Sequence, residues 1–78
     1  MLGPPTDPRA SILDRCDYLG FVHGTRRWRS KNGRYLFTWD GLHGEIEVFT
    51  PRGEHRGVMN AVTGRWIKDA VRGRWIDV

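Results

Sequence analysis

Four titratable side chains lie close together in the segment Trp39–Glu47, namely Asp40, His43, Glu45 and Glu47. Groups of this kind can cleave RNA, because the 2′-hydroxyl beside each phosphate is an internal nucleophile. A base takes the 2′-hydroxyl proton, an acid protonates the leaving 5′-oxygen, and a cation stabilises the charge on the phosphorane. The segment therefore offers the titrating groups for RNA cleavage that needs no metal ion.

The spacing predicts how these groups lie. If the segment after the turn forms a strand, His43, Glu45 and Glu47 share one face of it. Asp40 then lies across a tight turn from His43, close enough to orient and charge its ring. On a straight strand, His43 and Glu47 stand about 13 Å apart, which suits an acid and a base on opposite sides of a bound phosphate. The alternative interpretation is a solvated strand face that carries ordinary His and Glu residues.

Basic residues occur in two stretches that also contain tryptophans. The first stretch surrounds Trp28, and the second contains Trp66 and Trp75. The cations are Arg26, Arg27, Arg29, Lys31, Arg34, Arg65, Lys68, Arg72 and Arg74. Cations for phosphates beside aromatic planes for unpaired bases are typical of RNA-binding surfaces. The same residues could instead form a solubilising charged surface over a core that contains the tryptophans.

The charge of the chain also favours a polyanionic partner. The formal net charge is +4 and the isoelectric point is about 10.0. Residues 1–25 carry two arginines against three aspartates, so the positive charge belongs to the rest of the chain. Nucleic acid is the polyanion that such a small basic domain most often binds.

Cysteine and histidine usage limits the possible metal sites. Cys16 is the only cysteine, which excludes an internal disulfide and a thiolate-based metal site. The three histidines are not clustered at ligand spacing in the sequence. We therefore expect neither a metal ion nor another cofactor.

Length and hydropathy predict one small domain without a membrane span. The chain has 78 residues, and no apolar run approaches the length that crosses a bilayer. The N-terminal residues also lack the charged and apolar regions of a signal peptide. If the protein leaves its cell, we expect another element to carry it.

Residues that typically begin and end helices predict a helix near the N-terminus. Asp7 is a suitable N-cap, Pro8 suits the first helical position, and Gly20 can end the helix. Between them runs an apolar stripe that consists of Ile12, Leu13, Cys16 and Leu19. We expect this stripe to pack against the rest of the domain.

After residue 26 the apolar period changes to that of strands. Strands are expected at residues 34–39, 44–50, 55–59, 65–68 and 74–78. Asp40–Gly41 is a hairpin signal and predicts that the first two are antiparallel neighbours. The tetrapeptide Gly-Arg-Trp-Ile occurs at 64–67 and again at 73–76, which predicts two paired strands of one hairpin. The predicted fold class is α+β, with a short N-terminal helix followed by a highly twisted antiparallel β-sheet.

Three parts of the chain are predicted from these elements. Residues 1–7 are rich in proline and are expected to be a linker or an artificial boundary. Residues 8–25 form the N-terminal helix and its connection. Residues 26–78 form the domain that carries the chemistry.

A longer motif gives these residues a family context. It reads Trp28-x4-Gly33-Arg34-x4-Trp39-Asp40-x2-His43-Gly44-Glu45-x-Glu47, followed by Gly53-x-His55-x-Gly57, Thr63-Gly64 and Lys68. Across roughly residues 26–76, with one small gap at 50–52, the chain resembles the cytotoxic domain of the ribosome-cutting colicins and cloacin. The string Trp-Asp-x-x-His-Gly-Glu-x-Glu is its most specific element.

The resemblance implies a metal-independent endoribonuclease toxin that cuts 16S ribosomal RNA in the decoding centre and so blocks translation. Glu47 would be the general base, His43 the general acid held by Asp40, and Arg74 the cation beside the phosphorane. The product would be a 2′,3′-cyclic phosphate. The RNA-binding positions implied are Lys68, Arg72, Arg34, Glu45, Phe37 and Phe49.

The resemblance also implies partners and a place of action. The partners are the small ribosomal subunit with its 16S ribosomal RNA and a small acidic immunity or antitoxin protein. Action is expected in the bacterial cytoplasm, with possible secretion or delivery as part of a larger toxin. The oligomeric state stays open.

The chain departs from the family at three places. Phe37 and Phe49 stand where the family has tyrosines, so two hydroxyl contacts are missing. Residues 69–73 replace a proline-rich stretch, so Arg72 could substitute for Arg74. Residues 1–25 match nothing in the family and could be a docking element or a remnant of a longer chain. A ribonuclease against transfer RNA or other RNA, and a non-catalytic RNA-binding module, are therefore the alternative functions.

Overall fold

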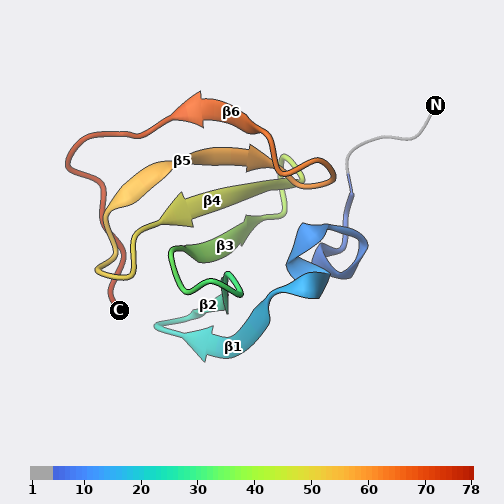
Figure 1. Cartoon of the computed structure of the whole chain (residues 1–78), viewed down its shortest axis with the longest axis horizontal. Coiled ribbons are helices and arrows are strands. Elements are labelled where there is room, and N and C mark those ends of the chain that lie inside the picture. Colours follow the sequence, from blue (N-terminus) through green and yellow to red (C-terminus); the bar gives the residue numbers. More distant parts are fainter. Residues whose placement is uncertain (1–4) are drawn as a thin grey trace.

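The computed structural model describes residues 5–78 and shows a six-stranded antiparallel sheet in which every strand pairs with the next one along the chain (Figure 1). Two short 3-10 helices precede the sheet: η1 (Pro8–Ala10) and η2 (Ile12–Arg15). The strands are β1 (Asp17–Val22), β2 (Thr25–Arg29), β3 (Leu36–Asp40), β4 (Glu45–Phe49), β5 (His55–Asn60) and β6 (Trp66–Asp69).

The predicted α+β class is wrong, because no α-helix is present in residues 5–78. Asp7 does cap a helical turn, since its side chain accepts a hydrogen bond from the Arg9 N–H. The turn ends at Ser11, whose extended backbone begins a second turn and whose hydroxyl accepts from the Leu13 N–H. A side chain that bonds the local backbone in this way competes with continuous helix. Gly20 has a φ of +82° within β1, where it lies at a bulge and does not end a helix.

The predicted linker is only partly within the described residues. Residues 1–4 lie outside them. Asp7 belongs to the cap of η1 and also forms an ion pair with Arg9. The division of the chain at residues 7 and 25 stays a prediction, although η2 contributes to the same core as the sheet.

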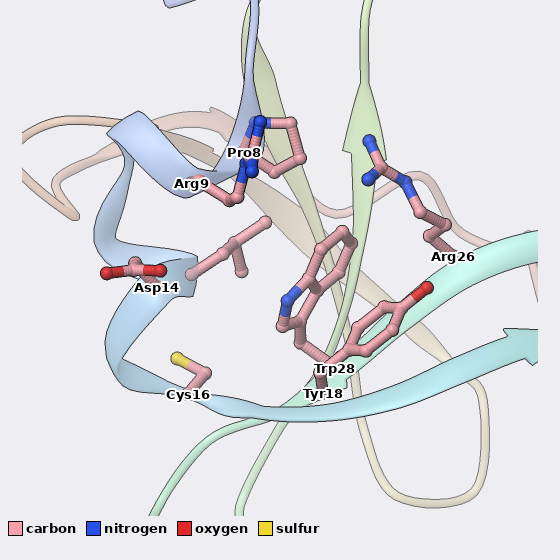
Figure 2. Close-up of a pocket in the computed structure, with 8 residues that line it drawn as sticks. Pro8, Arg9, Asp14, Cys16, Tyr18, Arg26 and Trp28 are labelled. Atoms are coloured by element: carbon pink, nitrogen blue, oxygen red, sulfur yellow. The ribbon is translucent and has the colours of Figure 1, made fainter.

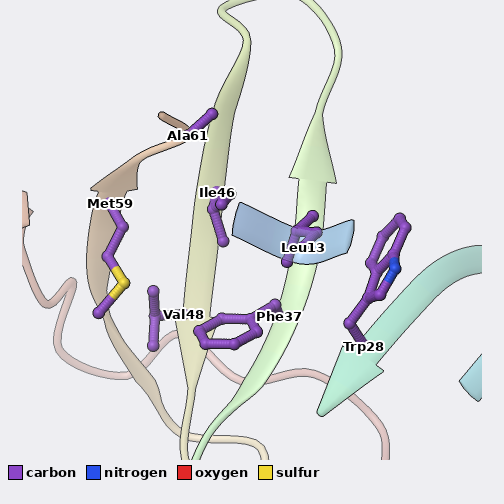
Figure 3. Close-up of a cluster of buried hydrophobic side chains, with 7 residues drawn as sticks. All are labelled: Leu13, Trp28, Phe37, Ile46, Val48, Met59 and Ala61. Atoms are coloured by element: carbon purple, nitrogen blue, oxygen red, sulfur yellow. The ribbon is translucent and has the colours of Figure 1, made fainter. Parts of the chain in front are cut away.

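The main hydrophobic cluster of the core lies on one face of the sheet, beneath the N-terminal turns (Figure 3), whereas Leu36, Phe49 and Val58 are buried on the opposite face. Directly paired residues of antiparallel strands point to the same side. The pairs Trp28–Phe37 and Phe37–Val48 therefore share the face of the main cluster, and Ile46 pairs with Met59 beside them. From the N-terminal turns, Leu13 reaches the same cluster with 1% of its surface exposed. Cys16 packs against the cluster as predicted, and burial raises the pKa of its thiol.

Strands β3 to β6 are close to those predicted at residues 34–39, 44–50, 55–59 and 65–68, and the pairing of β3 with β4 is confirmed. The strand predicted at residues 74–78 is wrong, because only Trp75 forms an isolated bridge there, and strands β1 and β2 were not predicted. The predicted hairpin between the two Gly-Arg-Trp-Ile copies is wrong. The first copy leads into β6, which pairs with β5. In the second copy, Trp75 bridges Glu54, and the Arg74 carbonyl accepts from the His55 N–H. Both copies thus lie along the same edge of β5, one after the other.

Candidate active site

The sheet face opposite the core carries the predicted acidic residues. Asp40, the last residue of β3, pairs directly with Glu45, the first residue of β4. Thr38 pairs with Glu47 two positions further along. Because strand residues alternate between faces, these side chains point away from the face that buries Ile46. The alternation read from the sequence therefore separates the core from the candidate site.

His43 lies in the turn between β3 and β4, which corrects the expectation that it shares the strand face of Glu45 and Glu47. The turn is closed by a 2.8 Å hydrogen bond from the Gly44 N–H to the Asp40 carbonyl. Gly44 has a φ of +64°, a conformation that a residue with a side chain adopts less readily. The turn brings the His43 ring back over Asp40.

Asp40 holds His43 by its side chain and its backbone. The His43 Nδ1 lies 2.7 Å from Asp40 Oδ2, while Oδ1 accepts from the backbone N–H groups of Leu42 and His43. The hydrogen bond from the His43 side chain is the main cause that lowers the pKa of Asp40. With Nδ1 engaged, Nε2 is the ring nitrogen left for proton transfer, and the His43 side chain is 55% exposed.

Glu47 is held between two nitrogen groups. Its Oε1 accepts a 3.0 Å hydrogen bond from Arg74 Nη1, and its Oε2 lies 2.8 Å from His55 Nε2. The Arg74 guanidinium also stands over the Phe49 ring, with 5.8 Å between the guanidinium carbon and the ring centroid. The structure thus places Arg74 at Glu47, whereas Arg72 lies in the turn that precedes it.

His55 is a site residue that the sequence prediction missed. Its side chain is 1% exposed, and its Nδ1 accepts a 2.9 Å hydrogen bond from the Val71 N–H. A backbone N–H can only donate, so the lone pair is at Nδ1 and the Nε2–H donates to Glu47. The sequence signal for this role is the position of His55 in the motif Gly53-x-His55-x-Gly57.

The C-terminal segment that carries Arg74 is attached to the chain just before β5. The His55 N–H donates to the Arg74 carbonyl, and the Ile76 N–H donates to the Gly53 carbonyl. Gly53 has a φ of +95°, and a Cβ there would lie 2.2 Å from the Ile76 carbonyl oxygen. This close approach requires glycine, and it fixes Arg74 beside Glu47.

The predicted RNA-binding residues have different surroundings. Lys68 on β6 lies near the site, with its Nζ 3.3 Å from Glu45 Oε1. Phe37 and Phe49 are 4% and 0% exposed, so neither ring is free to stack on a base. Arg34 is exposed in the loop before β3, at the end of that strand opposite Asp40.

One group of ligand atoms could hold a cation. The side chains of Asp40, His43 and Glu45 each offer one atom, and these atoms lie within 4.8 Å of one another. Carboxylate and imidazole ligands suit several divalent metals. Since Asp40 and His43 already bond each other and Glu45 pairs with Lys68, a bound metal would replace those contacts.

A pocket of about 270 Å³ lies away from this site, between the N-terminal turns and the first two strands (Figure 2). Tyr18 and Trp28 form part of its wall, and Arg26 stands over the Trp28 ring. Trp28 belongs to the core face, so the pocket opens on the other side of the sheet from Glu47. None of the predicted site residues lines it.

Among residues 5–78, no helix is long and apolar enough to cross a membrane.

Comparison with known proteins places the chain in a family. The model of the Cytotoxic family matches residues 21–77, which is more than half of the chain. Colicin E3 of Escherichia coli is 36% identical to this chain over 44 residues. The aligned region covers 55% of this chain and 8% of colicin E3, so the chain spans a small part of that relative.

Proposed function

This chain belongs to the Cytotoxic family of colicin-type ribonuclease domains, and we propose that it is an endoribonuclease that cuts 16S ribosomal RNA in the decoding centre. The observation that best supports the proposal is the set of hydrogen bonds made by the Glu47 carboxylate. This carboxylate is bonded by Arg74 and His55 on the sheet face that also carries the Asp40–His43 pair. A base, an acid and a cation therefore converge on one surface.

In the proposed reaction, Glu47 accepts the proton of the 2′-hydroxyl, and the 2′-oxygen attacks the adjacent phosphorus. Arg74 exchanges its contact with Glu47 for one with the phosphoryl oxygens, which frees Oε1 for the proton and neutralises the phosphorane. His55 keeps its hydrogen bond to Oε2 and so holds the carboxylate in position.

His43 completes the reaction as the general acid. Its Nε2 gives a proton to the 5′-oxygen as the bond from phosphorus to that oxygen breaks. The products are a 2′,3′-cyclic phosphate and a free 5′-hydroxyl. Asp40 keeps the ring oriented through Nδ1 and compensates the positive charge that the ring carries before transfer.

The proposal extends to partners. The positive charge of residues 26–78 suits the phosphates of the small ribosomal subunit. A small acidic immunity protein would neutralise the same surface in the producing cell. The toxin would act in the bacterial cytoplasm after delivery by a larger protein.

A second candidate is a ribonuclease toxin that cuts transfer RNA or another RNA. Phe49 supports this candidate, because its ring lies beneath the Arg74 guanidinium and supplies no hydroxyl there. This alternative keeps the same chemistry and changes only the substrate.

The first experiment incubates the protein with bacterial 70S ribosomes and total transfer RNA in magnesium buffer, and maps RNA ends by primer extension. Glu47→Gln is the test variant, and Glu54→Gln, an exposed carboxylate before β5, is the matched control. We expect one new end in the decoding region of 16S ribosomal RNA, made by the wild type and Glu54→Gln and absent with Glu47→Gln. Intact 16S ribosomal RNA beside cleaved transfer RNA would favour the second candidate, and no cleavage of any RNA would contradict both.

The need for metal is tested separately, because ribosomes require magnesium for their own structure. A short single-stranded RNA is incubated with the protein in EDTA, and the new ends are examined for a 2′,3′-cyclic phosphate. Cleavage that persists in EDTA supports acid–base chemistry by Glu47 and His43. Cleavage that needs added metal would instead implicate the ligand group of Asp40, His43 and Glu45.

A further inference from the structure

Arg27 on β2 is a buried cation without a partner. It keeps 3% of its surface exposed, as little as the apolar residues of the core. Within residues 5–78, its Nε has no hydrogen-bond partner and its guanidinium takes part in no ion pair. Burying an unpaired charge is costly, and buried arginine is normally paired. The position of Arg27 therefore requires an explanation beyond packing.

The register of the sheet places Arg27 on the same face as Glu47. Arg27 pairs directly with Thr38, and Thr38 pairs directly with Glu47. Neighbouring strands lie about 4.8 Å apart, so the backbones of Arg27 and Glu47 are separated by roughly 10 Å across the sheet. The adjacent Trp28 points into the core on the other face, which agrees with this assignment.

One row of directly paired residues thus crosses the sheet through the candidate base. Val58 pairs with Glu47 and with Lys68, so Lys68 lies two strands from Glu47 on the side opposite Arg27. The other partner of Arg27 is Gly20 on β1, which carries no charge. The row reads Arg27, Thr38, Glu47, Val58 and Lys68, and its cations are at the two ends.

We infer that Arg27 is a binding site for an RNA phosphate on the β2 side of Glu47, separate from the phosphate that is cut. The inference rests on the proposed function and adds a contact that positions the RNA strand. A guanidinium binds phosphate oxygens in a planar fork. Of the three guanidinium nitrogens, only Nε is fully enclosed without a partner. Nη1 and Nη2 are therefore the atoms that a phosphate would contact, in surroundings that largely exclude water. Lys68 would hold the strand on the other side of Glu47.

The test measures binding of a single-stranded 2′-O-methyl RNA, which cannot be cut because its nucleophile is blocked. Fluorescence anisotropy is recorded over a range of salt concentrations for the wild type, Arg27→Met, Arg27→Lys and the control Arg15→Met. Arg15 is an exposed arginine on η2 and loses the same charge. Unfolding temperatures are measured for all four proteins.

We expect Arg27→Met to lower the slope of log affinity against log salt by about 0.7, and to weaken binding about fivefold near 0.1 M salt. Arg27→Lys keeps the slope, and Arg15→Met behaves as the wild type. Arg27→Met unfolds at the same or a higher temperature, because it removes an unpaired buried charge. An unchanged slope overturns the inference. So does weaker binding that comes with a lower unfolding temperature and is not rescued by lysine, since that pattern marks a structural arginine.

Cleavage of unmodified RNA by the wild type is measured beside the binding. If the wild type binds the analogue with the Arg27-dependent slope but cuts no RNA, the proposed function fails and the phosphate site stands. If the wild type cuts RNA and the slope does not depend on Arg27, the phosphate site fails and the proposed function stands.

Discussion

At the scale of single residues, Glu47 depends on His55 for its position. The ring makes two hydrogen bonds with different atoms, accepting from Val71 at Nδ1 and donating to Glu47 at Nε2. These two bonds can be separated by substitution. Glutamine places an N–H near Nε2, whereas asparagine places an acceptor near Nδ1.

We predict that His55→Gln keeps more cleavage activity than His55→Asn. A hydrogen bond to a charged group contributes about 1.5–3 kcal/mol, so losing the donor to Glu47 lowers kcat roughly ten- to hundredfold. His55→Asn should be the more stable of the two to urea, because it keeps the acceptor for Val71. Single-turnover cleavage measures the order of the two activities, and urea unfolding measures the order of the two stabilities. If both variants lost the same activity and the same stability, the two ring nitrogens would not have the separate roles assigned to them.

The pKa of Asp40 predicts an effect of pH on stability. The hydrogen bond from His43 lowers the pKa of Asp40 in the folded state. The stability that ionised Asp40 gives to the folded protein is therefore complete above the ordinary aspartate pKa of about 3.9. It is lost as the pH falls through the lower pKa that Asp40 has in the folded state. We predict that the stability difference between the wild type and Asp40→Asn is constant above about pH 5 and shrinks as the pH falls below the ordinary aspartate pKa of about 3.9. Urea unfolding at several pH values measures this, and a constant difference would contradict it.

At the scale of elements, the segment after β6 is what places Arg74 at the site. Its attachment depends on Gly53, where a Cβ would meet the Ile76 carbonyl oxygen. We predict that Gly53→Ala displaces this segment, costs roughly 1–3 kcal/mol of unfolding free energy, and lowers kcat more than it raises KM. Gly33→Ala is the control, because Gly33 also has a positive φ and open space around its Cβ position. If both variants lost the same activity, the close approach of Gly53 to the Ile76 carbonyl would not be what positions Arg74.

The sequence was informative about these elements to different degrees. Alternation over residues 44–50 correctly separated Ile46 and Val48 from Glu45 and Glu47, because a strand with one buried face has a period of two. The prediction of an N-terminal helix was wrong. Asp7 and Pro8 start a helical turn equally well whether that turn continues as a helix or ends at Ser11, as it does here. The contact of Arg74 with Glu47 joins positions 27 residues apart, which no local pattern encodes. His55 lies on the strand next to Glu47, but the sequence does not show that its ring turns towards the carboxylate.

At the scale of the whole molecule, the N-terminal turns and the sheet form one unit. Leu13 is almost fully buried among residues of the strands, and the Ile12 N–H donates to the Ala61 carbonyl. We predict that Leu13→Ala costs about 2–5 kcal/mol, a large share of the stability of a small domain. Tryptophan fluorescence and far-ultraviolet circular dichroism should then report one shared transition at a lower urea concentration. Two separate transitions would show that the turns unfold independently.

The order of strands in the sheet also has a kinetic consequence. Each strand pairs with its sequence neighbour, so the chain can zip from one hairpin to the next without first closing a long loop. Proteins dominated by such local pairings fold faster than sheets built from distant segments. The late step would be the closure of residues 8–15 over the core, since the hydrogen bond from the Ile12 N–H to the Ala61 carbonyl joins residues 49 positions apart. A chain with this topology should therefore regain its sheet rapidly after complete unfolding, without help from a chaperone.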